Sequence, residues 1–389
     1  MRADFDHITI DQLRAAGGLK WTAYPDAIGM FVAEMDFGVP PPVAAVLRRA
    51  AADGALGYPT GHDLQALREA TSGWLDRTTG WDVPAGRVHP LPDVLTALRQ
   101  TIRHFTPDGS AVIVPTPAYM PFLTVPVAAG REVVQVPSRV DAAGRYSLDL
   151  DGIDAAFAGG ARLLVLCNPW NPVGRVLDRE ELLAVAEVVE RHGGRVFADE
   201  IHAPLVLDDR PHLPYAALDE RTAAHTVTAV AASKGWNIPG LKCGQMVLSN
   251  DADAARFAPY AEDAGNPLGL LGTRAATAVY TDDGGWNAEV VEYLRAGRDL
   301  LEDLVAEHLP GAVLSHLEGT YIAWLDCAGL GLDEPAAGFF RREAGVALTD
   351  GAACGDGGAG CVRLVMATPR PILRRALKQM GAALTRRAG

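Results

Sequence analysis

The sequence predicts an α/β fold in which a mostly parallel central sheet is flanked by helices. Short apolar runs rich in β-branched residues recur between about residues 111 and 249. Helical stretches separate several of them, notably the amphipathic segment at 179–193. Such alternation is typical of parallel sheets with helices on both faces. The expected strands are 111–115, 131–137, 162–167, 195–199, 226–233 and 244–249.

Further elements are expected on both sides of this region. Residues 42–57 have apolar side chains at helical spacing, proline at the start and glycine at the end, so they should form a helix. A long helical region near 272–306 precedes two strand candidates, 321–326 and 361–366, and a C-terminal helix.

The length of the chain bounds its domain organisation. The 389 residues are enough for two or three structural units. We expect an N-terminal arm at 1–45 that contributes to a small domain, a large cofactor-binding domain at 46–272, and a long linking helix with the small α+β domain at 273–389. In doubly wound sheets, ligands bind at the carboxyl ends of the strands. The functional site is therefore expected where the strands of the large domain end.

Composition and charge exclude several classes of protein. Hydrophobic residues make up 49% and charged residues 21% of the chain, as in a soluble globular protein. The formal charge of −13 argues against a general nucleic-acid or anionic-membrane surface, which would need a basic footprint. The five cysteines are scattered without a CxxC pair, so we expect buried free thiols and no metal site.

No membrane segment is expected. The longest uncharged stretch, 111–130, contains four prolines and cannot run as one spanning helix, so it should form a strand followed by a loop. The N-terminal residues carry acids and lack the apolar core of a signal peptide. We therefore expect a cytoplasmic protein.

Four short segments fall at strand ends or in the loops after them, where a doubly wound sheet would gather them into one site. They are TPAY (116–119), CNPWNPVG (167–174), ADEIH (198–202) and ASKGWNIPGLKCG (232–244). A pyridoxal phosphate (PLP) site needs a lysine for an imine, an acid facing the pyridine nitrogen, donors to the phenolic oxygen, a phosphate cradle and an aromatic surface. The chain can supply all of these groups.

In their order and spacing, these segments resemble the fold-type I, class I/II aminotransferase superfamily of PLP enzymes over nearly the whole chain. The branch with the most similar pattern is that of the carbon–sulfur β-lyases of the MalY/PatB type. FVAEMDFGVPPPV (31–43), GYP (57–59) and VRLVMATPRPIL (362–373) point to that branch. The resemblance implies the fold of these enzymes and PLP as the cofactor.

The resemblance also assigns roles around the cofactor ring. Lys234 matches the lysine that forms the Schiff base, and apolar neighbours with a cationic partner would lower its pKa. Asp199 matches the acid that faces the pyridine nitrogen, and Asn171 matches a donor to the phenolic oxygen. His202 stands three residues after Asp199, where the lyase branch carries histidine. Tyr119 matches the aromatic residue that stacks on the ring.

The cofactor phosphate is expected at the N-terminus of the helix that begins within LPDVLTALR (91–99), where free N–H groups and the helix dipole favour an anion. Val94 and Leu95 would offer N–H groups, and Ser233 would add a hydroxyl. Lys242 stands where many superfamily members place a phosphate-binding arginine.

Two further positions bear on the phosphate. Relatives usually have a small residue where Asp93 stands, and this carboxylate can instead turn away as a helix cap. Tyr58 matches a residue that, in the family, reaches the phosphate from the neighbouring subunit. The resemblance therefore implies a homodimer with shared active sites.

Arg363 matches the arginine that grips the substrate α-carboxylate, for which bidentate pairing is suited; the alternative is a structural ion pair. An amino acid held there would free Lys234 to remove the α-proton. A thiolate on the β-carbon would then be expelled, and the rest would decay to pyruvate and ammonia. The same residues suit an aminotransferase, or decarboxylative or oxidative chemistry, so the choice of elimination rests on the resemblance. Outside enzymes, the alternative is a PLP-bound regulatory protein.

The segment GAACGDGGAGC (351–361) precedes Arg363, in a region where relatives often have bulkier residues. Its small side chains would leave room for a large substrate. We therefore expect a bulky cysteine S-conjugate from a specialised pathway rather than cystathionine itself.

Overall fold

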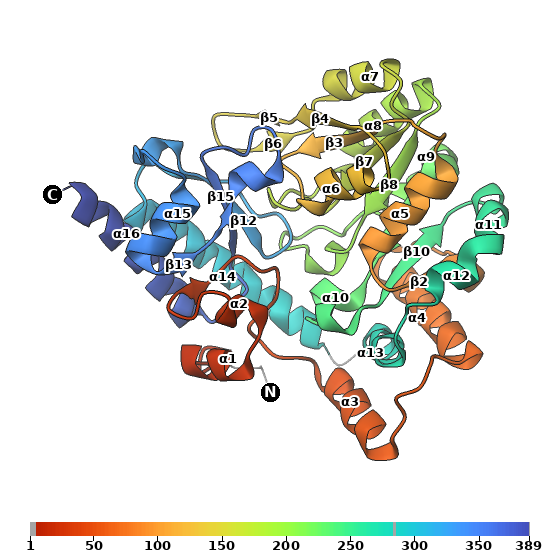
Figure 1. The fold of residues 1–389 in the computed structure, drawn as a ribbon, viewed down its shortest axis with the longest axis horizontal. Coiled ribbons are helices and arrows are strands. Elements are labelled where there is room, and N and C mark those ends of the chain that lie inside the picture. Colours follow the sequence, from red (N-terminus) through yellow and green to blue (C-terminus); the bar gives the residue numbers. More distant parts are fainter. Residues whose placement is uncertain (1–4, 283–284, 389) are drawn as a thin grey trace.

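The chain folds into a larger α/β domain and a smaller domain built mainly from the C-terminal residues (Figure 1). This computed structural model describes residues 5–282 and 285–388. The N-terminal segment, with α1 (Ile10–Ala16) and α2 (Leu19–Thr22), lies beside the smaller domain. Its strand β1 (Ile28–Gly29) pairs with β13 (Val346–Ala347). Residues from both ends of the chain thus meet in the smaller domain.

A seven-stranded sheet forms the centre of the larger domain, in the order β2-β10-β9-β8-β7-β3-β4. Its strands are β2 (Val88–Leu91), β3 (Val112–Thr116), β4 (Val133–Pro137), β7 (Leu163–Cys167), β8 (Arg195–Asp199), β9 (Thr226–Val230) and β10 (Gly244–Leu248). Neighbours from β9 to β4 are parallel, whereas β10 is antiparallel to both β9 and β2. The expected mostly parallel sheet is confirmed, with the run at 244–249 as a reversed strand.

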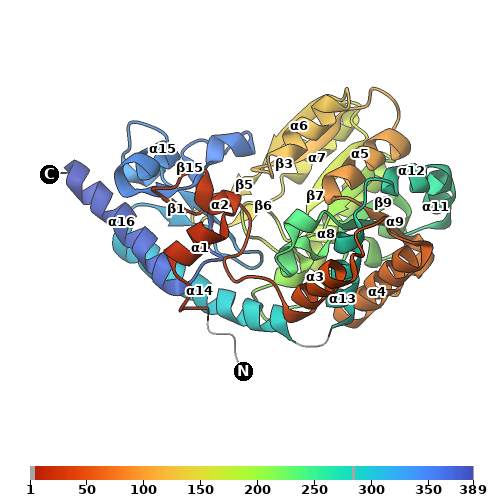
Figure 2. The same cartoon turned by 60° about the horizontal axis from the view of Figure 1, so that its bottom comes forward.

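Helices surround this sheet. They are α3 (Pro41–Asp53), α4 (Gly61–Thr79), α5 (Val94–Phe105), α6 (Pro121–Ala128), α7 (Leu150–Ala158), α8 (Arg179–Arg191), α9 (Glu220–His225), α10 (Ala232–Gly235), α11 (Asp251–Phe257), α12 (Ala261–Gly265) and α13 (Leu270–Thr281). α5 and α6 contact each other, as do α7 and α8, and these helices share one apolar core with the strands. α3, α4 and α13 form a separate group at the β2 edge (Figure 2).

Two local expectations need correction. The helix predicted at 42–57 is α3, which ends at Asp53 because Gly54, with a φ of 63°, caps it in the left-handed conformation. The residues after β3 were expected to form a loop, but they include the helix α6. Pro121 opens that helix, where a missing N–H leaves no hydrogen bond unmade. The prolines thus exclude a long helix without excluding a short one.

The smaller domain contains a four-stranded antiparallel sheet in the order β11-β12-β15-β14. Its elements are β11 (Val313–Leu314), β12 (Ile322–Asp326), β14 (Thr349–Asp350), β15 (Cys361–Val365), α14 (Trp286–His308), α15 (Ala336–Phe339) and α16 (Arg370–Ala388). The helical region expected near 272–306 is two helices, α13 and α14. In the smaller domain, the helices α14 and α16 pack along each other.

This architecture brings the four segments singled out in the sequence to one place. β3, β7, β8 and β9 are adjacent and parallel, so their carboxyl ends share one edge, and each is followed by one of the four segments.

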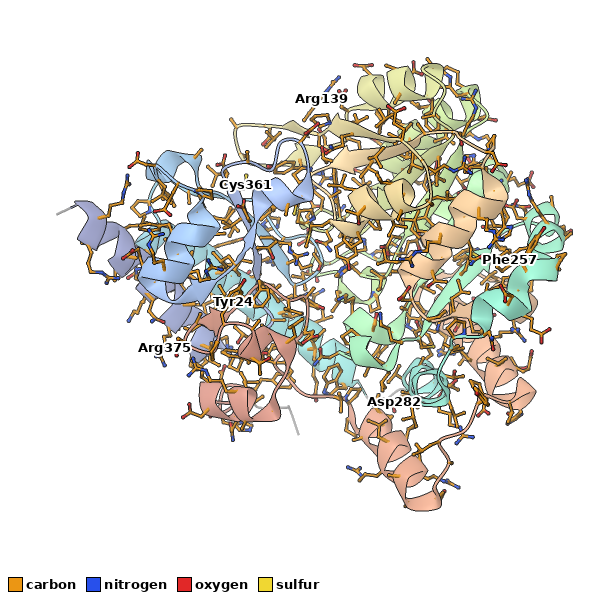
Figure 3. All side chains as sticks on the ribbon, viewed as in Figure 1. Tyr24, Arg139, Phe257, Asp282, Cys361 and Arg375 are labelled. Carbon is orange, nitrogen blue, oxygen red and sulfur yellow. The ribbon has the colours of Figure 1, made fainter. Side chains whose placement is uncertain are left out.

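A short hairpin of β5 (Arg139–Val140) and β6 (Tyr146–Ser147) extends from the same domain. Figure 3 shows Tyr24 on the N-terminal segment next to the smaller domain. Among the described helices, none is long and apolar enough to cross a membrane.

Candidate active site

A pocket of about 500 Å³ opens where the strand ends of the larger domain meet the N-terminal segment and the smaller domain. This volume is within the range of about 300–1,000 Å³ that is usual for small-molecule sites. Seven of the eleven residues predicted for the site line it: Val94, Tyr119, Asn171, Asp199, His202, Lys234 and Arg363. Tyr24, Phe31, Leu348 and Thr349 add walls from the N-terminal segment and the smaller domain.

Lys234 lies in α10, just after β9, and its Nζ donates to the backbone oxygen of Ala33 at 2.8 Å. Burial lowers the pKa of Lys234 to about 8, and the nearby Arg363 guanidinium acts in the same direction. Loss of water and a cationic neighbour are the causes that the sequence predicted. An amine with such a pKa is partly unprotonated near neutral pH, which suits a nucleophile or a base.

Asp199 closes β8, next to Cys167 of β7, and is buried. Its Oδ1 accepts the N–H of Ile201 at 3.0 Å, whereas no donor within the described ranges bonds Oδ2. Burial raises the pKa of Asp199 to about 7, although the Ile201 N–H and the Lys234 charge act to lower it. The carboxyl group is thus short of stabilising partners and is available to a cationic group in the pocket.

Arg363 enters the pocket from β15 of the smaller domain. Its guanidinium donates to the Phe31 carbonyl at 2.9 Å and, at 3.4 Å, to Thr349 Oγ1 and Asn171 Oδ1. In the part of the chain that the structure describes, no carboxylate pairs with it, and its buried Nε has no partner. A buried cation without a counter-ion favours an anion in the pocket. The geometry therefore does not show the structural ion pair that was the alternative.

Tyr119 and His202 line the pocket between these charged groups. Burial raises the pKa of the half-buried Tyr119, whose ring meets Phe122 edge-on with 5.4 Å between the centroids. His202 is fully buried, and its Nδ1 lies 2.9 Å from Thr320 Oγ1. Burial holds the pKa of His202 well below its usual range, and the charge of Lys234 acts in the same direction. The imidazole is therefore neutral near neutral pH.

The predicted phosphate position is the N-terminus of α5. Over the described residues, no acceptor bonds the backbone N–H groups of Val94 and Leu95. Asp93 caps the helix, because its Oδ1 accepts the Thr96 N–H at 2.8 Å. Lys242 pairs with Asp93 Oδ2 at 3.1 Å and is 65% exposed. Asp93 thus turns to the helix as a cap, and Lys242 neutralises it.

Four predicted residues do not line the pocket: Leu95, Ser233, Lys242 and Tyr58. Tyr58 is 89% exposed and lines a separate pocket of about 440 Å³ beside Arg68 and His89 of the same chain. Within one chain it does not reach Lys234. The roles of these four residues toward a phosphate stay predictions.

Sequence reasoning missed how the site is held from outside the four segments. The carbonyl of Ala33 accepts from Lys234 and also from the Tyr321 hydroxyl at 2.9 Å. The Asn237 side chain bonds both the N–H and the carbonyl of Met35 at 2.9 Å. The segment 31–43 carries the resemblance to the lyase branch, and the structure shows in addition that its Ala33 carbonyl holds Lys234. Thr320 and Tyr321 gave no local signal, because they lie just before β12, far along the chain from the four segments.

The glycine- and alanine-rich segment 351–361 does not line the pocket. A Cβ on Gly358 would lie 2.0 Å from the oxygen of Gly351, and one on Gly355 would lie 2.4 Å from Gln135 Oε1. Small residues are therefore needed here so that the backbone can pack closely against itself and against the larger domain. The expectation that they leave room for a large substrate stays a prediction.

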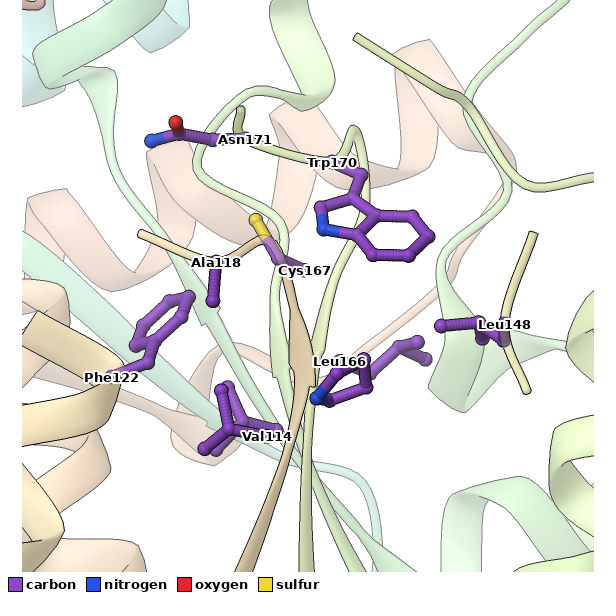
Figure 4. A pocket seen from close by; sticks show the side chains of 10 residues that line it. Val114, Ala118, Phe122, Leu148, Leu166, Cys167, Trp170 and Asn171 are labelled. Carbon is purple, nitrogen blue, oxygen red and sulfur yellow. The ribbon is translucent and has the colours of Figure 1, made fainter. Parts of the chain in front are cut away.

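Apolar side chains close the floor beneath the polar groups (Figure 4). Val114, Phe122 and Leu166 surround a space of only about 10 Å³ next to Cys167, while Asn171 directs its amide away from them. This space is about the size of one water molecule. All five cysteines are free and buried, as expected. The strand ends thus carry the polar groups on a tightly packed base.

Comparison with known proteins identifies the family. The chain matches the family described as aminotransferase class I and II over residues 25–379. It belongs to this family. Within the family, it is 38% identical to a putative cystathionine β-lyase from Mycobacterium tuberculosis, over 98% of both chains. It is 32% identical to cystathionine β-lyase PatB of Bacillus subtilis, over 92% of this chain and 93% of that one.

A solved structure supports the same assignment of this chain to the aminotransferase class I and II family. The crystal structure of a putative PLP-dependent β-cystathionase from Corynebacterium diphtheriae matches with a TM-score of 0.92 and 35% identity. The match covers 98% of this chain and 99% of that one. The fold and the resemblance to the lyase branch, both expected from the sequence, are confirmed.

The residues of the pocket fit PLP, the cofactor of the related structures. Lys234 offers an amine of lowered pKa, and Asp199 offers a buried carboxyl oxygen without a donor. The unbonded N–H groups of Val94 and Leu95 open the helix α5, where a phosphate is favoured. Each group that the cofactor requires therefore has a candidate partner.

Proposed function

We propose that the protein is a PLP-dependent carbon–sulfur β-lyase. Its substrate would be an L-cysteine thioether, such as cystathionine or another cysteine S-conjugate, and its products a thiol, pyruvate and ammonia. The convergence of Lys234, Asp199 and Arg363 in one pocket, from three different elements, carries the proposal. The names of the relatives, which include cystathionine β-lyases, support the choice of reaction.

Binding of the substrate carboxylate falls to Arg363. Its guanidinium faces the pocket, and its Nε–H has no acceptor among the residues described. A carboxylate would satisfy this group and form the bidentate pair that the planar guanidinium favours. The amino acid is then held in the pocket that also contains the Lys234 amine.

Proton transfer falls to Lys234 and Asp199. PLP, when bound, supplies a ring that withdraws the electron pair left on the α-carbon. Asp199 holds a proton at the ring nitrogen, because a buried carboxylate is stabilised by a cationic partner. Lys234 takes the α-proton on Nζ. The electrons of the carbon–sulfur bond leave with sulfur, which takes the proton from Nζ and departs as a thiol. Solvent water then hydrolyses the remaining three-carbon fragment to pyruvate and ammonia.

A homodimer with shared sites is part of the proposal. Tyr58 is almost fully exposed, although a large aromatic side chain is usually at least partly buried. Leu56, in the same segment between α3 and α4, is also exposed, at 66%. A second copy of the chain would cover both side chains and would receive Tyr58 at its own cofactor phosphate.

A product assay tests the reaction. Purified protein with PLP is given L-cystathionine or S-benzyl-L-cysteine, and thiol, pyruvate and ammonia are measured with and without 2-oxoglutarate. Elimination predicts equal amounts of all three products, independent of 2-oxoglutarate. Lys234→Ala should abolish product formation, whereas Lys378→Ala on α16 is the matched control and should not.

Two other outcomes would contradict the proposal. Glutamate formed from 2-oxoglutarate without release of thiol would make the protein an aminotransferase. PLP binding without turnover of either thioether would favour a regulatory protein. The ratio of rates on the two thioethers also shows whether the site prefers a bulky leaving group.

A further inference from the structure

His202 is held from behind by a residue that the reaction scheme does not use. Its Nδ1 lies 2.9 Å from the hydroxyl of Thr320, and both side chains are buried. Within the described residues, Nε2 has no hydrogen-bond partner, and the ring lines the pocket. The ring is in a T-shaped arrangement with Tyr321, with 6.0 Å between the ring centroids. The ring therefore has one nitrogen engaged and one left for the pocket.

The backbone at Thr320 is strained and is fixed in that state by its neighbours. Its φ of 63° is uncommon for a β-branched residue. The Thr320 N–H donates to the carbonyl of Leu205 at 2.7 Å, and the Glu318 and Gly319 N–H groups donate to Gly174 at 2.9 and 3.0 Å. A Cβ at Gly319 would lie 2.6 Å from the Val176 side chain. The segment thus has one conformation, which aims the hydroxyl at His202.

Ion pairs of Glu318 hold the same segment in place. The buried Glu318 carboxylate pairs with Arg145, Arg175 and Arg210. It also accepts the Val176 N–H at 2.8 Å. Strained backbone persists only where the surroundings over-determine it. These bonds supply that constraint immediately before Thr320.

The direction of the Thr320–His202 hydrogen bond follows from donor and acceptor counts. A threonine hydroxyl can either donate or accept. No other acceptor within the described ranges bonds the Thr320 hydroxyl. If His202 Nδ1 carried the proton, the buried hydroxyl hydrogen would have no acceptor, which costs free energy. Donation from Thr320 to an unprotonated Nδ1 satisfies both groups and leaves the proton on Nε2.

We propose that Thr320 is a positioning residue that locks His202 in the tautomer protonated on Nε2, so that His202 presents a fixed N–H donor to the phenolic oxygen of the cofactor. This inference rests on the proposed cofactor site. The charged groups around the ring are Lys234 and Arg363, with Asp199 three residues earlier in the same pocket. The two cations oppose a third positive charge, so the neutral donor is the form that this pocket accepts.

A nuclear magnetic resonance experiment reads the tautomer directly. The full-length protein with PLP is labelled with ¹⁵N-histidine, and the ring nitrogen shifts of His202 are identified by their absence in His202→Gln. We expect Nε2 to be protonated and Nδ1 to be unprotonated at neutral pH. Thr320→Val should remove this preference, whereas Thr320→Ser, which restores a hydroxyl, should recover it.

The matched control is Thr71→Val. Thr71 is another buried threonine, but its hydroxyl donates to the Leu67 carbonyl within α4, away from the pocket. Its variant should leave the His202 shifts unchanged. A wild-type His202 protonated on Nδ1, or an unchanged tautomer in Thr320→Val, would overturn the inference. If Thr320→Val does not fold, the wild-type and Thr320→Ser spectra still decide.

A spectral readout distinguishes this inference from the proposed reaction. Loss of a donor to the phenolic oxygen should raise the pH midpoint of the visible cofactor band by about one unit in Thr320→Val, and Thr320→Ser should restore it. An unchanged midpoint would overturn the cofactor half of the inference. Both readouts require bound cofactor but no turnover. A protein that fails to cleave thioethers would therefore contradict the lyase proposal and leave the inference about Thr320 standing.

Discussion

At the residue scale, the site depends on buried charged groups that the fold leaves without a counter-ion or with part of their hydrogen-bonding capacity unused. Arg363 is buried with an orphaned Nε and no carboxylate among the described residues. Asp199 keeps one carboxyl oxygen without a donor. Unsatisfied buried polar groups are rare in folded proteins because each costs free energy. These two groups line the same pocket, and the proposed chemistry follows from that arrangement.

Replacing Arg363 tests its proposed role in binding the carboxylate. Arg363→Gln should lower kcat/KM for a thioether substrate about a hundredfold, since a charge-assisted pair is lost. Arg363→Lys keeps the charge but not the fork, so its loss should be smaller. Steady-state kinetics check both, with the exposed Arg375→Gln as the control (Figure 3). Equal kinetics in Arg363→Gln and wild type would contradict the role.

The raised pKa of Asp199 predicts how the stability of the cofactor-free protein depends on pH. Because burial raises the folded-state pKa to about 7, the folded protein keeps a proton that the unfolded chain releases near pH 4. The free energy of unfolding should therefore fall as pH rises from about 4 to about 7. Asp199→Asn should flatten this slope in thermal melts, and the exposed Asp151→Asn should not. Equal slopes in all three proteins would contradict the assignment.

The sequence predicts the residues of the site where position on the chain determines position in space. Lys234, Asp199 and Asn171 follow strand ends, and parallel strands carry their ends to one edge. Thr320 and the Ala33 carbonyl escape such reasoning, because their contacts depend on how a distant strand and the N-terminal segment pack. The close packing of the small residues at 351–361 is likewise a tertiary property, which the sequence alone does not show.

At the element scale, a single carboxylate ties several segments together. Glu318, just before β12, pairs with Arg145 of the β5–β6 hairpin, with Arg175 after the CNPWNPVG segment and with Arg210. Arg175 is itself buried and also holds Glu181 of α8. The smaller domain is thus joined to three segments of the larger one through one buried acid.

Glu318→Gln should therefore destabilise the protein. Removing one partner of a buried charge network leaves charge uncompensated, at a cost of about 3 kcal/mol in the free energy of unfolding. Denaturant unfolding checks this value. The matched control is Glu334→Gln, whose pair with Arg342 is exposed and should contribute little. A similar loss of unfolding free energy in both variants would contradict the proposed stabilising role of the buried Glu318 network.

Element boundaries were less predictable than the elements themselves. Six of the seven strands of the central sheet overlap the six expected apolar runs, whereas β2 was not expected. The end of α3 depends on which of several glycines takes the left-handed conformation, and the sequence does not distinguish Gly54 from Gly57. Similarly, β10 has the apolar pattern of its neighbours, and its antiparallel direction between β2 and β9 cannot be predicted from that pattern.

At the scale of the whole molecule, the proposed dimer predicts complementation between two inactive variants. If each site takes Lys234 from one chain and Tyr58 from its partner, a hybrid of Lys234→Ala and Tyr58→Ala chains has one intact site. When the two are mixed after dissociation, half of the dimers are hybrids, so activity should recover to about a quarter of the wild-type value.

The same mixture has a built-in control. A hybrid of Lys234→Ala with Arg363→Gln has an intact site only if these two residues belong to different chains. Both line one pocket within a single chain. This second mixture should therefore stay inactive, and recovery in it, or failure of the first mixture to recover, would contradict the shared site.

The central claim, that Lys234 carries the cofactor of a lyase site, is tested most directly by reductive trapping. The protein has four lysines, Lys20, Lys234, Lys242 and Lys378, so assignment by peptide mass is unambiguous. Borohydride reduction of the PLP-loaded protein should fix the cofactor on Lys234 alone. Addition of a cysteine thioether just before reduction should free Lys234 from the label. Label on Lys242, or on no lysine, would contradict the claim that Lys234 carries the cofactor.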